Sequence, residues 1–166
     1  TEEFTAENYN PREWARLAKK AGMKYAVLTA KHHDGFCLFD TKLTDYNSMN
    51  AACHKDLVKE FLEACRAEGI KVGLYFSIID WHHPDFPKYG DRQHPMRNNL
   101  AYKDEKIDFD RYLEYMHGQV KELVTNYGKL DLLWFDFSYD DMTGEKWKAT
   151  ELIKMVRTYQ PDVIID

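Results

Sequence analysis

An aspartate and a tryptophan lie two residues apart in the apolar segment 132–137. If this segment is a strand, the alternation of side chains places Trp134 and Asp136 on one face. A carboxylate among apolar side chains is costly unless it has a partner or a chemical use. Nucleophilic attack on the anomeric carbon of a sugar needs such a fixed carboxylate beside an apolar wall. Asp136 is therefore a candidate nucleophile, and a structural or helix-capping aspartate is the alternative interpretation.

Two adjacent histidines, His32 and His33, stand in the segment Lys-His-His-Asp-Gly-Phe at residues 31–36. Neutral imidazoles both donate and accept hydrogen bonds, which suits them to sugar hydroxyls. A core histidine with an exposed neighbour is the alternative. A further interpretation adds His82 and His83, so that the four histidines bind zinc in a metal-dependent hydrolase. The four lack the i, i+4 spacing of a helical zinc motif, so the sequence favours a site without a metal.

A tyrosine with small neighbours is the third candidate. Tyr75 alternates with Gly73 and Ser77, so the three share one face of a predicted strand. Small neighbours leave room for the phenol to meet a ligand, and a core tyrosine is the alternative. The segment Asp-Trp-His-His-Pro at 80–84 then opens a polar loop that extends to about residue 106, and loops of this length are often functional. This segment either shapes the mouth of a site or anchors the loop.

The elements that position these residues alternate between helix and strand. Apolar residues at helical spacing, followed by Gly22, Gly69 or Gly128, predict helices, and short apolar runs predict strands. Helices are expected at 13–20, 55–68, 108–127 and 144–159, and strands at 24–31, 70–78, 130–137 and 162–165. Such alternation is typical of a parallel sheet.

Two architectures fit this alternation: an open doubly wound sheet and part of a (β/α)8 barrel. No glycine-rich phosphate loop follows any predicted strand, which disfavours a nucleotide-binding doubly wound sheet. The polar clusters follow strand ends, where both architectures bind their ligands. No linker interrupts residues 1–166. We expect a single α/β domain, a partial (β/α)8 TIM-like barrel with about four parallel strands.

Charge and composition limit the partners of the chain. The 166 residues carry a formal net charge of −5 without a lysine or arginine block, which disfavours nucleic-acid binding. No apolar run approaches the roughly 20 residues that span a membrane, so no membrane partner is expected. The three cysteines lack metal-like spacing and are expected to be free thiols. Free thiols favour the cytoplasm and no leader is visible, but the N-terminus is expected to be truncated, so the compartment stays open.

Taken together, these segments resemble the glycoside hydrolase family 29 α-L-fucosidases. The strongest similarity lies in LAKKAGMKYAVLTAKHHDGFCLFDTKLTDYNS, followed by HKDLVKEFLEACRAEGIKVGLYFSIIDWHHPDF and YGKLDLLWFDFSYDD. The KHHDGF segment is highly specific in this setting, whereas LWFD alone would be weak. The resemblance spans nearly the whole chain.

The resemblance implies a (β/α)8-like catalytic domain that removes terminal L-fucose with retention, through a covalent fucosyl-enzyme intermediate. It implies a fucosylated oligosaccharide or glycoconjugate as the partner, and no cofactor. The site residues that it implies are the nucleophile Asp136, the fucose-binding His32 and His33, the sugar-contacting Tyr75, and Trp134 two residues before the nucleophile.

The chain also departs from the family pattern. The family's tyrosine strand usually reads Tyr-Tyr, and the second position here is Phe76. The first barrel strand with its His-Trp-Gly and Glu-Trp-Tyr segments, the arginine after VIID, and the general acid/base have no counterpart, and Asp140, Asp141 and Glu145 are expected to be solvated. We therefore expect strands two to five of eight, with two open sheet edges that invite self-association. An inactive fucose-binding module or an assembly-dependent half-barrel is the alternative to an active hydrolase.

Overall fold

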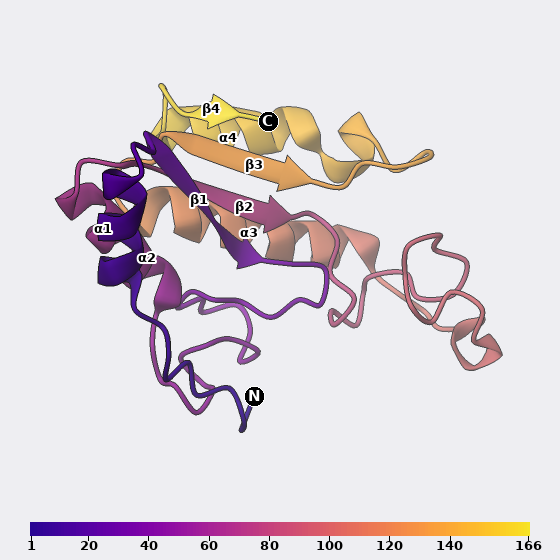
Figure 1. The fold of residues 1–166 in the computed structure, drawn as a ribbon. Helices are drawn as coiled ribbons and strands as arrows, with labels where there is room; N and C mark the ends of the chain where they lie inside the picture. Colours follow the sequence, from indigo (N-terminus) through magenta and orange to yellow (C-terminus); the bar gives the residue numbers. More distant parts are fainter.

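The computed structural model describes all 166 residues and contains one sheet of four parallel strands. The strands are β1 (Tyr25–Lys31), β2 (Lys71–Ser77), β3 (Leu132–Asp136) and β4 (Ile164–Ile165). Each strand pairs with the next one in the chain, so the spatial order is β1-β2-β3-β4 (Figure 1). The parallel sheet expected from the sequence is confirmed.

Four α-helices alternate with the strands, as the sequence predicts. They are α1 (Pro11–Lys20), α2 (Leu57–Ala67), α3 (Phe109–Asn126) and α4 (Ala149–Tyr159). The first three begin after Asn10, Asp56 and Asp108, and each of these side chains accepts a hydrogen bond from the backbone N–H three residues later. Such caps satisfy N–H groups that the first helical turn leaves without a partner.

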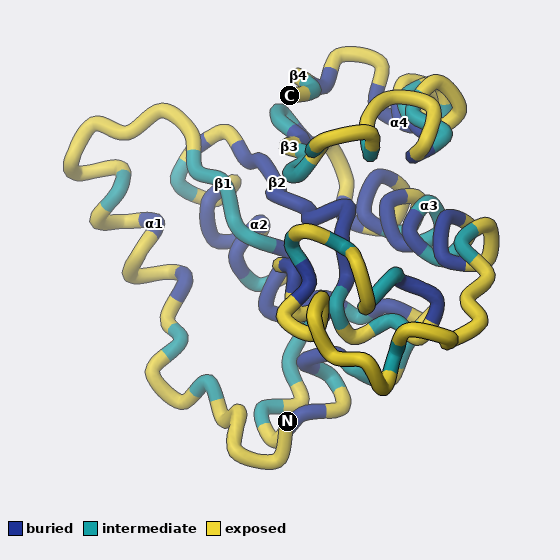
Figure 2. Tube along the Cα trace, turned by 90° about the vertical axis from the view of Figure 1, so that its right-hand side faces the viewer, coloured by how far each residue is buried: buried dark blue, intermediate teal, exposed yellow.

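The hydrophobic core lies between the helices and one face of the sheet (Figures 1 and 2). Leu74, Leu133 and Val120 of α3 are fully buried in this layer. No helix covers the opposite face of the sheet, which we call the open face. Trp134 and Ile164 on this face are 44% and 63% exposed. A sequential strand order with helices on one face is the arrangement of a (β/α)8 barrel, whereas a doubly wound sheet has helices on both faces and a reversal of strand order.

The last residues of β1 depart from regular strand pairing. Thr29 pairs with Tyr75, whereas Lys31 pairs with Phe76, so the register shifts between Thr29 and Lys31. Phe76 belongs to the core, and Lys31 is fully buried in the same layer. Regular alternation would have placed Lys31 on the open face with Thr29. The irregularity therefore moves a charged side chain from the open face to the helix side, as bulges near functional sites often do.

Two segments differ from the sequence-based expectation. β3 ends at Asp136, because Phe137 has a φ of 88° and cannot continue a strand. The helix expected at 144–159 is divided into a 3-10 helix, Gly144–Trp147, and α4, because Lys148 between them is left-handed with a φ of 50°. Periodicity gave the extent of the helical region correctly but contained no signal for this break.

Ion pairs anchor the long loop between β2 and α3, which contains the 3-10 helix Leu100–Tyr102. Nε and an Nη of Arg111 donate to the two carboxylate oxygens of Asp85 at 2.6 and 2.7 Å. Arg92 donates to Asp140 at 2.8 Å, which ties the loop to the segment after β3. One ion pair therefore holds the start of the loop to α3, and the other holds its middle to the segment after β3.

The three cysteines are free, as expected, and Cys37 and Cys65 are buried. None of the helices combines the length and the apolar character that a membrane crossing requires.

Candidate active site

The carboxyl ends of β2 and β3 bring Tyr75 and Asp136 into contact. The parallel register pairs Tyr75 with Trp134 and Ser77 with Asp136, so these side chains share the face of the sheet opposite the helices. The Tyr75 hydroxyl donates a hydrogen bond to Oδ2 of Asp136. Burial, and then the contact with Asp136, raises the pKa of Tyr75 above its ordinary value. The tyrosine is therefore a neutral donor that leaves the other carboxylate oxygen unoccupied.

Two rings lie against Tyr75. The indole of Trp134 meets it edge to face at a centroid distance of 5.4 Å, and the imidazole of His32 stacks on it at 5.6 Å with an interplanar angle of 13°. His32 is itself exposed. An exposed apolar indole and an exposed polar imidazole thus lie on either side of the tyrosine that binds the carboxylate.

His33 is buried, unlike its neighbour. It is 8% exposed, and its Nδ1 lies 2.7 Å from the hydroxyl oxygen of Ser77. The ring centroids of His32 and Phe137 lie 4.0 and 4.7 Å from that of His33, and the Phe137 ring meets it edge to face. Burial, and then the charge of His32, lowers the pKa of His33. The ring is therefore neutral near pH 7 and presents both a donor and an acceptor nitrogen.

The backbone turns sharply after Asp136. Phe137 is one of a few non-glycine residues with a positive φ, at 88°. Such a conformation is strained for a residue with a large side chain and persists only where the surroundings enforce it. This backbone conformation directs the Phe137 ring against His33, so the residue that follows Asp136 contacts one of the two histidines.

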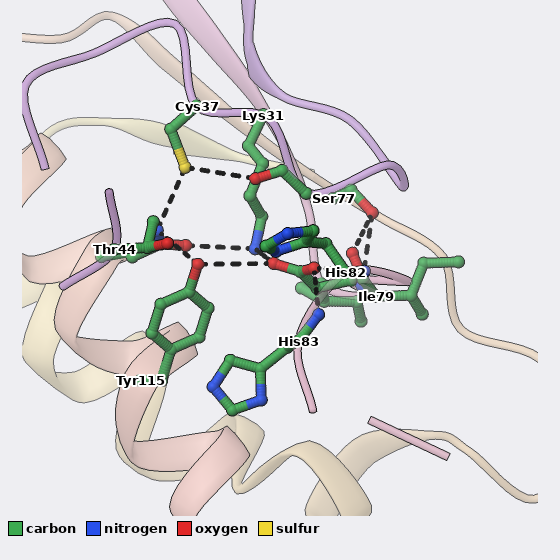
Figure 3. Close-up of polar contacts among 12 residues, drawn as sticks. Lys31, Cys37, Thr44, Ser77, Ile79, His82, His83 and Tyr115 are labelled. Atoms are coloured by element: carbon green, nitrogen blue, oxygen red, sulfur yellow. Dashed lines mark hydrogen bonds and ion pairs between the residues drawn. The ribbon is translucent and has the colours of Figure 1, made fainter. Parts of the chain in front are cut away.

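Lys31, at the end of β1, forms a buried ion pair (Figure 3). Nζ of Lys31 is 3.1 Å from Oδ2 of Asp80 and 3.1 Å from Oε1 of Gln119, and both charged side chains are at most 1% exposed. Oδ1 of Asp80 accepts the backbone N–H groups of His82 and His83 at 3.0 and 2.9 Å. Asp80 is therefore a loop anchor, one of the two roles that the sequence left open for its segment.

The turn after β1 closes directly on this anchor. Gly35 has a φ of +81°, and a Cβ atom there would lie 2.3 Å from Oδ1 of Asp80. The backbone N–H of Trp81 also donates to the carbonyl oxygen of His33 at 2.8 Å. The turn that carries the histidines is thus held to the loop after β2 by backbone and side-chain contacts.

The alternative zinc site is not supported. His82 stacks on Tyr46 at 4.0 Å, and the ring of His83 lies 4.4 Å from that of Tyr115. No group of three or more histidine, cysteine, aspartate or glutamate side chains is arranged to hold a metal ion. The two histidine pairs therefore do not converge on a common centre.

The residues singled out from the sequence form one continuous set of contacts. The set consists of Asp136, Tyr75, Trp134, His32 and His33.

Three residues that contact or support this set were not singled out for a role: Lys31, Ser77 and Phe137. A lysine that ends an apolar strand is the signal that could have indicated Lys31.

Comparison with known proteins gives a consistent result. The model of the family described as alpha-L-fucosidase matches residues 1–166. Among solved structures, alpha-L-fucosidase isoenzyme 1 from Paenibacillus thiaminolyticus is 68% identical with a TM-score of 0.98, and the match covers 99% of this chain and 39% of that one. The α-L-fucosidase from Lactobacillus casei in complex with α-L-fucose is 32% identical with a TM-score of 0.84, and the match covers 98% of this chain and 52% of that one.

The curated relatives agree with these structures. The tissue alpha-L-fucosidase of Homo sapiens is 31% identical over 160 residues, which cover 96% of this chain and 31% of that protein. A putative alpha-L-fucosidase from rice is 42% identical over 157 residues, which cover 92% of this chain and 26% of that protein. The chain thus spans about a third of the length of the curated relatives it matches.

Proposed function

The chain belongs to the α-L-fucosidase family, and on this premise we propose that the full-length protein hydrolyses terminal α-L-fucosides with retention. The observation that carries the proposal is the hydrogen bond from Tyr75 to Asp136 at the carboxyl ends of adjacent strands. Active sites of (β/α)8 barrels lie at this end of the strands. A carboxylate beside an indole and imidazoles also matches the needs of a sugar site.

Asp136 acts as the nucleophile in this proposal. Its carboxylate attacks the anomeric carbon, an ester bond to the sugar forms, and the glycosidic C–O bond breaks as the leaving oxygen takes a proton from a general acid. Water then attacks the same carbon, gives its proton to the acid/base group, and releases fucose and the free carboxylate. Tyr75 binds Oδ2 of Asp136, so Oδ1 is the attacking atom.

The remaining residues of the site bind the sugar in this proposal. His32 and His33 each form hydrogen bonds with sugar hydroxyls, because a neutral imidazole has one donor and one acceptor nitrogen and either can meet a hydroxyl. The exposed indole of Trp134 provides an apolar surface for C–H groups and for the methyl group of a 6-deoxy sugar. Recognition and nucleophilic attack thus involve neighbouring strand ends.

We assign the general acid to another part of the full-length protein. A general acid needs a raised pKa and a position roughly 5–5.5 Å from the nucleophile. Asp140 is paired with Arg92, and the side chain of Asp141 is 82% exposed. Hydrogen bonds from the side chain and backbone of Thr150 lower the pKa of Glu145. None of these acidic residues has the environment of a proton donor.

The substrate class follows from the chemistry and from the relatives. A variant of the Lactobacillus casei enzyme with one substitution has been described in complex with Fucα(1,6)GlcNAc and with a 4-nitrophenyl α-L-fucopyranoside substrate. We extend this to the present protein and propose a terminal fucose on an oligosaccharide or glycoconjugate as its substrate, with no cofactor. Residues 1–166 then form part of a single catalytic barrel.

The test is hydrolysis of an aryl α-L-fucoside by the full-length protein and its Asp136→Gly variant. Loss of the nucleophile should lower kcat by a factor on the order of 10³ or more. Asp141→Gly is the matched control, because it removes an exposed carboxylate from the same segment and should leave kcat unchanged. An Asp136→Gly variant with wild-type kcat would refute the assignment.

Azide distinguishes a missing nucleophile from a disturbed fold. In Asp136→Gly, azide can attack the anomeric carbon from the side that the carboxylate has vacated. We expect azide to restore turnover and to yield the β-configured fucosyl azide, the product of a single displacement. A folded Asp136→Gly protein that azide fails to reactivate would argue against a nucleophilic role.

A further inference from the structure

A buried serine links His33 to the backbone of the loop after β2. Nδ1 of His33 lies 2.7 Å from Oγ of Ser77, and the same Oγ lies 2.8 Å from the carbonyl oxygen of Ile79. Figure 3 shows the contacts between Ser77 and Ile79. Both residues are fully buried. The imidazole, the hydroxyl and the carbonyl therefore form a chain of two contacts that meet at the buried Oγ of Ser77.

The serine has one hydroxyl proton for these two neighbours. The carbonyl oxygen of Ile79 can only accept, so its contact with Ser77 is a hydrogen bond only if the hydroxyl donates to it. His33 can donate through Nδ1–H. A single arrangement satisfies every group: Nδ1–H of His33 donates to Oγ, and Oγ–H donates to the carbonyl. The opposite arrangement leaves a buried carbonyl without a donor, which is costly.

We propose that Ser77 is a positioning residue that holds His33 in the neutral tautomer with its proton on Nδ1, so that Nε2 accepts a hydrogen bond from a sugar hydroxyl. The identity of the ligand rests on the proposed fucosidase function. The tautomer itself rests only on the geometry of the free protein. With its proton on Nδ1, His33 can only accept a hydrogen bond from the sugar, so the sugar hydroxyl at Nε2 must be the donor.

The surroundings of His33 support a fixed, neutral ring. Phe137 and Trp81 contact it at centroid distances of 4.7 and 5.4 Å, which limits rotation of the imidazole. Burial lowers the pKa of His33 and so favours the neutral form. Nε2 has no hydrogen-bond partner, and Nε1 of Trp81 is the one fully buried side-chain nitrogen or oxygen without a partner. Nε2 therefore retains contact with solvent and is available to a ligand.

Nitrogen NMR tests the tautomer directly. Long-range ¹H–¹⁵N correlation spectra of the full-length protein with ¹⁵N-labelled histidine separate protonated from unprotonated ring nitrogens, and the His33 signals are those absent in His33→Gln. We expect a protonated Nδ1 and an unprotonated Nε2 at pH 7 to 8. A protonated Nε2 in the wild-type protein would overturn the proposal, and this measurement requires no variant of Ser77.

Ser77→Ala tests the positioning role. We expect the NMR signature of the fixed tautomer to be lost and KM for an aryl α-L-fucoside to rise about tenfold, with kcat changed much less. Ser77→Thr retains the hydroxyl and should recover the wild-type tautomer. Ser48→Ala is the matched control, because Ser48 is also fully buried and donates to a carbonyl oxygen, that of Lys55 at 2.7 Å. It should leave both the His33 spectrum and KM unchanged.

The possible failures are distinguishable. A Ser77→Ala protein with the wild-type spectrum and KM would overturn the positioning role. If Ser77→Ala does not fold, the wild-type spectrum decides the tautomer, and the KM of Ser77→Thr decides whether the hydroxyl is sufficient. The spectra are recorded without substrate, so a wild-type protein without fucosidase activity would contradict the proposed function and leave the tautomer as measured.

Discussion

In the proposed mechanism, the neutral hydroxyl of Tyr75 prepares the carboxylate of Asp136 for attack. The tyrosine binds Oδ2 of Asp136, and its raised pKa keeps the hydroxyl protonated over the pH range in which carboxylates are ionised. The phenol therefore donates to the charged form of the aspartate. It also restricts rotation of the carboxylate and leaves Oδ1 without a hydrogen-bond partner.

Tyr75→Phe should weaken catalysis without removing the nucleophile. A hydrogen bond to a charged group contributes about 1.5–3 kcal/mol, which corresponds to a decrease in kcat/KM of roughly 10- to 100-fold. The measurement is kcat/KM of the full-length protein for an aryl α-L-fucoside. Tyr25→Phe is the control, because Tyr25 is 63% exposed at the other end of the sheet and should be silent. Unchanged kcat/KM in Tyr75→Phe would contradict this account.

The sequence predicts most of the site at the scale of single residues. Alternation alone places Trp134 and Asp136 on one face, and the same reasoning places Tyr75 and Ser77 together. It does not reveal that Ser77 contacts His33, because the two residues are 44 positions apart and the contact depends on how the turn after β1 packs against the end of β2. The sequence also gives no indication of the positive φ of Phe137, since phenylalanine has no local preference for that conformation.

At the scale of the elements, the sequence predicts the strands themselves but not the irregular pairing at their ends, which shapes the candidate site. Apolar runs and helical spacing located all four strands and all four α-helices. They could not locate the register shift between Thr29 and Lys31, because a shift in pairing is a property of two strands together. This shift buries Lys31 beside Asp80, and the resulting ion pair anchors the loop that follows β2.

Gly35→Ala should destabilise the turn after β1. The new Cβ atom would lie 2.3 Å from Oδ1 of Asp80 at a φ of +81°, so either the turn or the anchor must move. Gly90→Ala is the matched control, since Gly90 has a φ of +79° and nothing within 4 Å of its Cβ position. The two variants share the backbone strain and differ in the steric contact.

We expect Gly35→Ala to lower the free energy of unfolding by about 1–3 kcal/mol more than Gly90→Ala does. Urea denaturation of both variants measures the difference, and KM for an aryl fucoside should rise only in Gly35→Ala. Equal losses of stability in the two variants would show that the contact with Asp80 is easily relieved.

At the scale of the whole molecule, the sheet is open in two ways. β1 and β4 each have a strand on one side only, and the face opposite the helices carries Tyr25, Trp134 and Ile164, which are all exposed. Open edges and exposed apolar side chains favour pairing with another chain. The self-association expected from the sequence therefore has a structural basis and stays a prediction.

Residues 1–166 alone should associate in a concentration-dependent manner. Sedimentation velocity is the measurement, with the 19.7 kDa monomer as the reference mass. Replacing Tyr25 and Ile164 by lysine should shift the distribution towards monomer, because charges on the open face oppose apolar contact. Arg92→Lys, a change on the remote long loop, should leave the distribution unchanged. A monomer at every concentration would contradict the prediction.

The sequential strand order has a consequence for the way the chain is made. Each strand pairs with the strand that precedes it in the chain, so no strand must wait for a partner that is synthesised much later. A ribosome adds about 5–20 residues per second, so a segment of about 50 residues takes roughly 3–10 s. Strand docking is far faster than that. The sheet can therefore grow by one strand–helix unit at a time during translation, and each new strand pairs with the edge that the preceding strand leaves open.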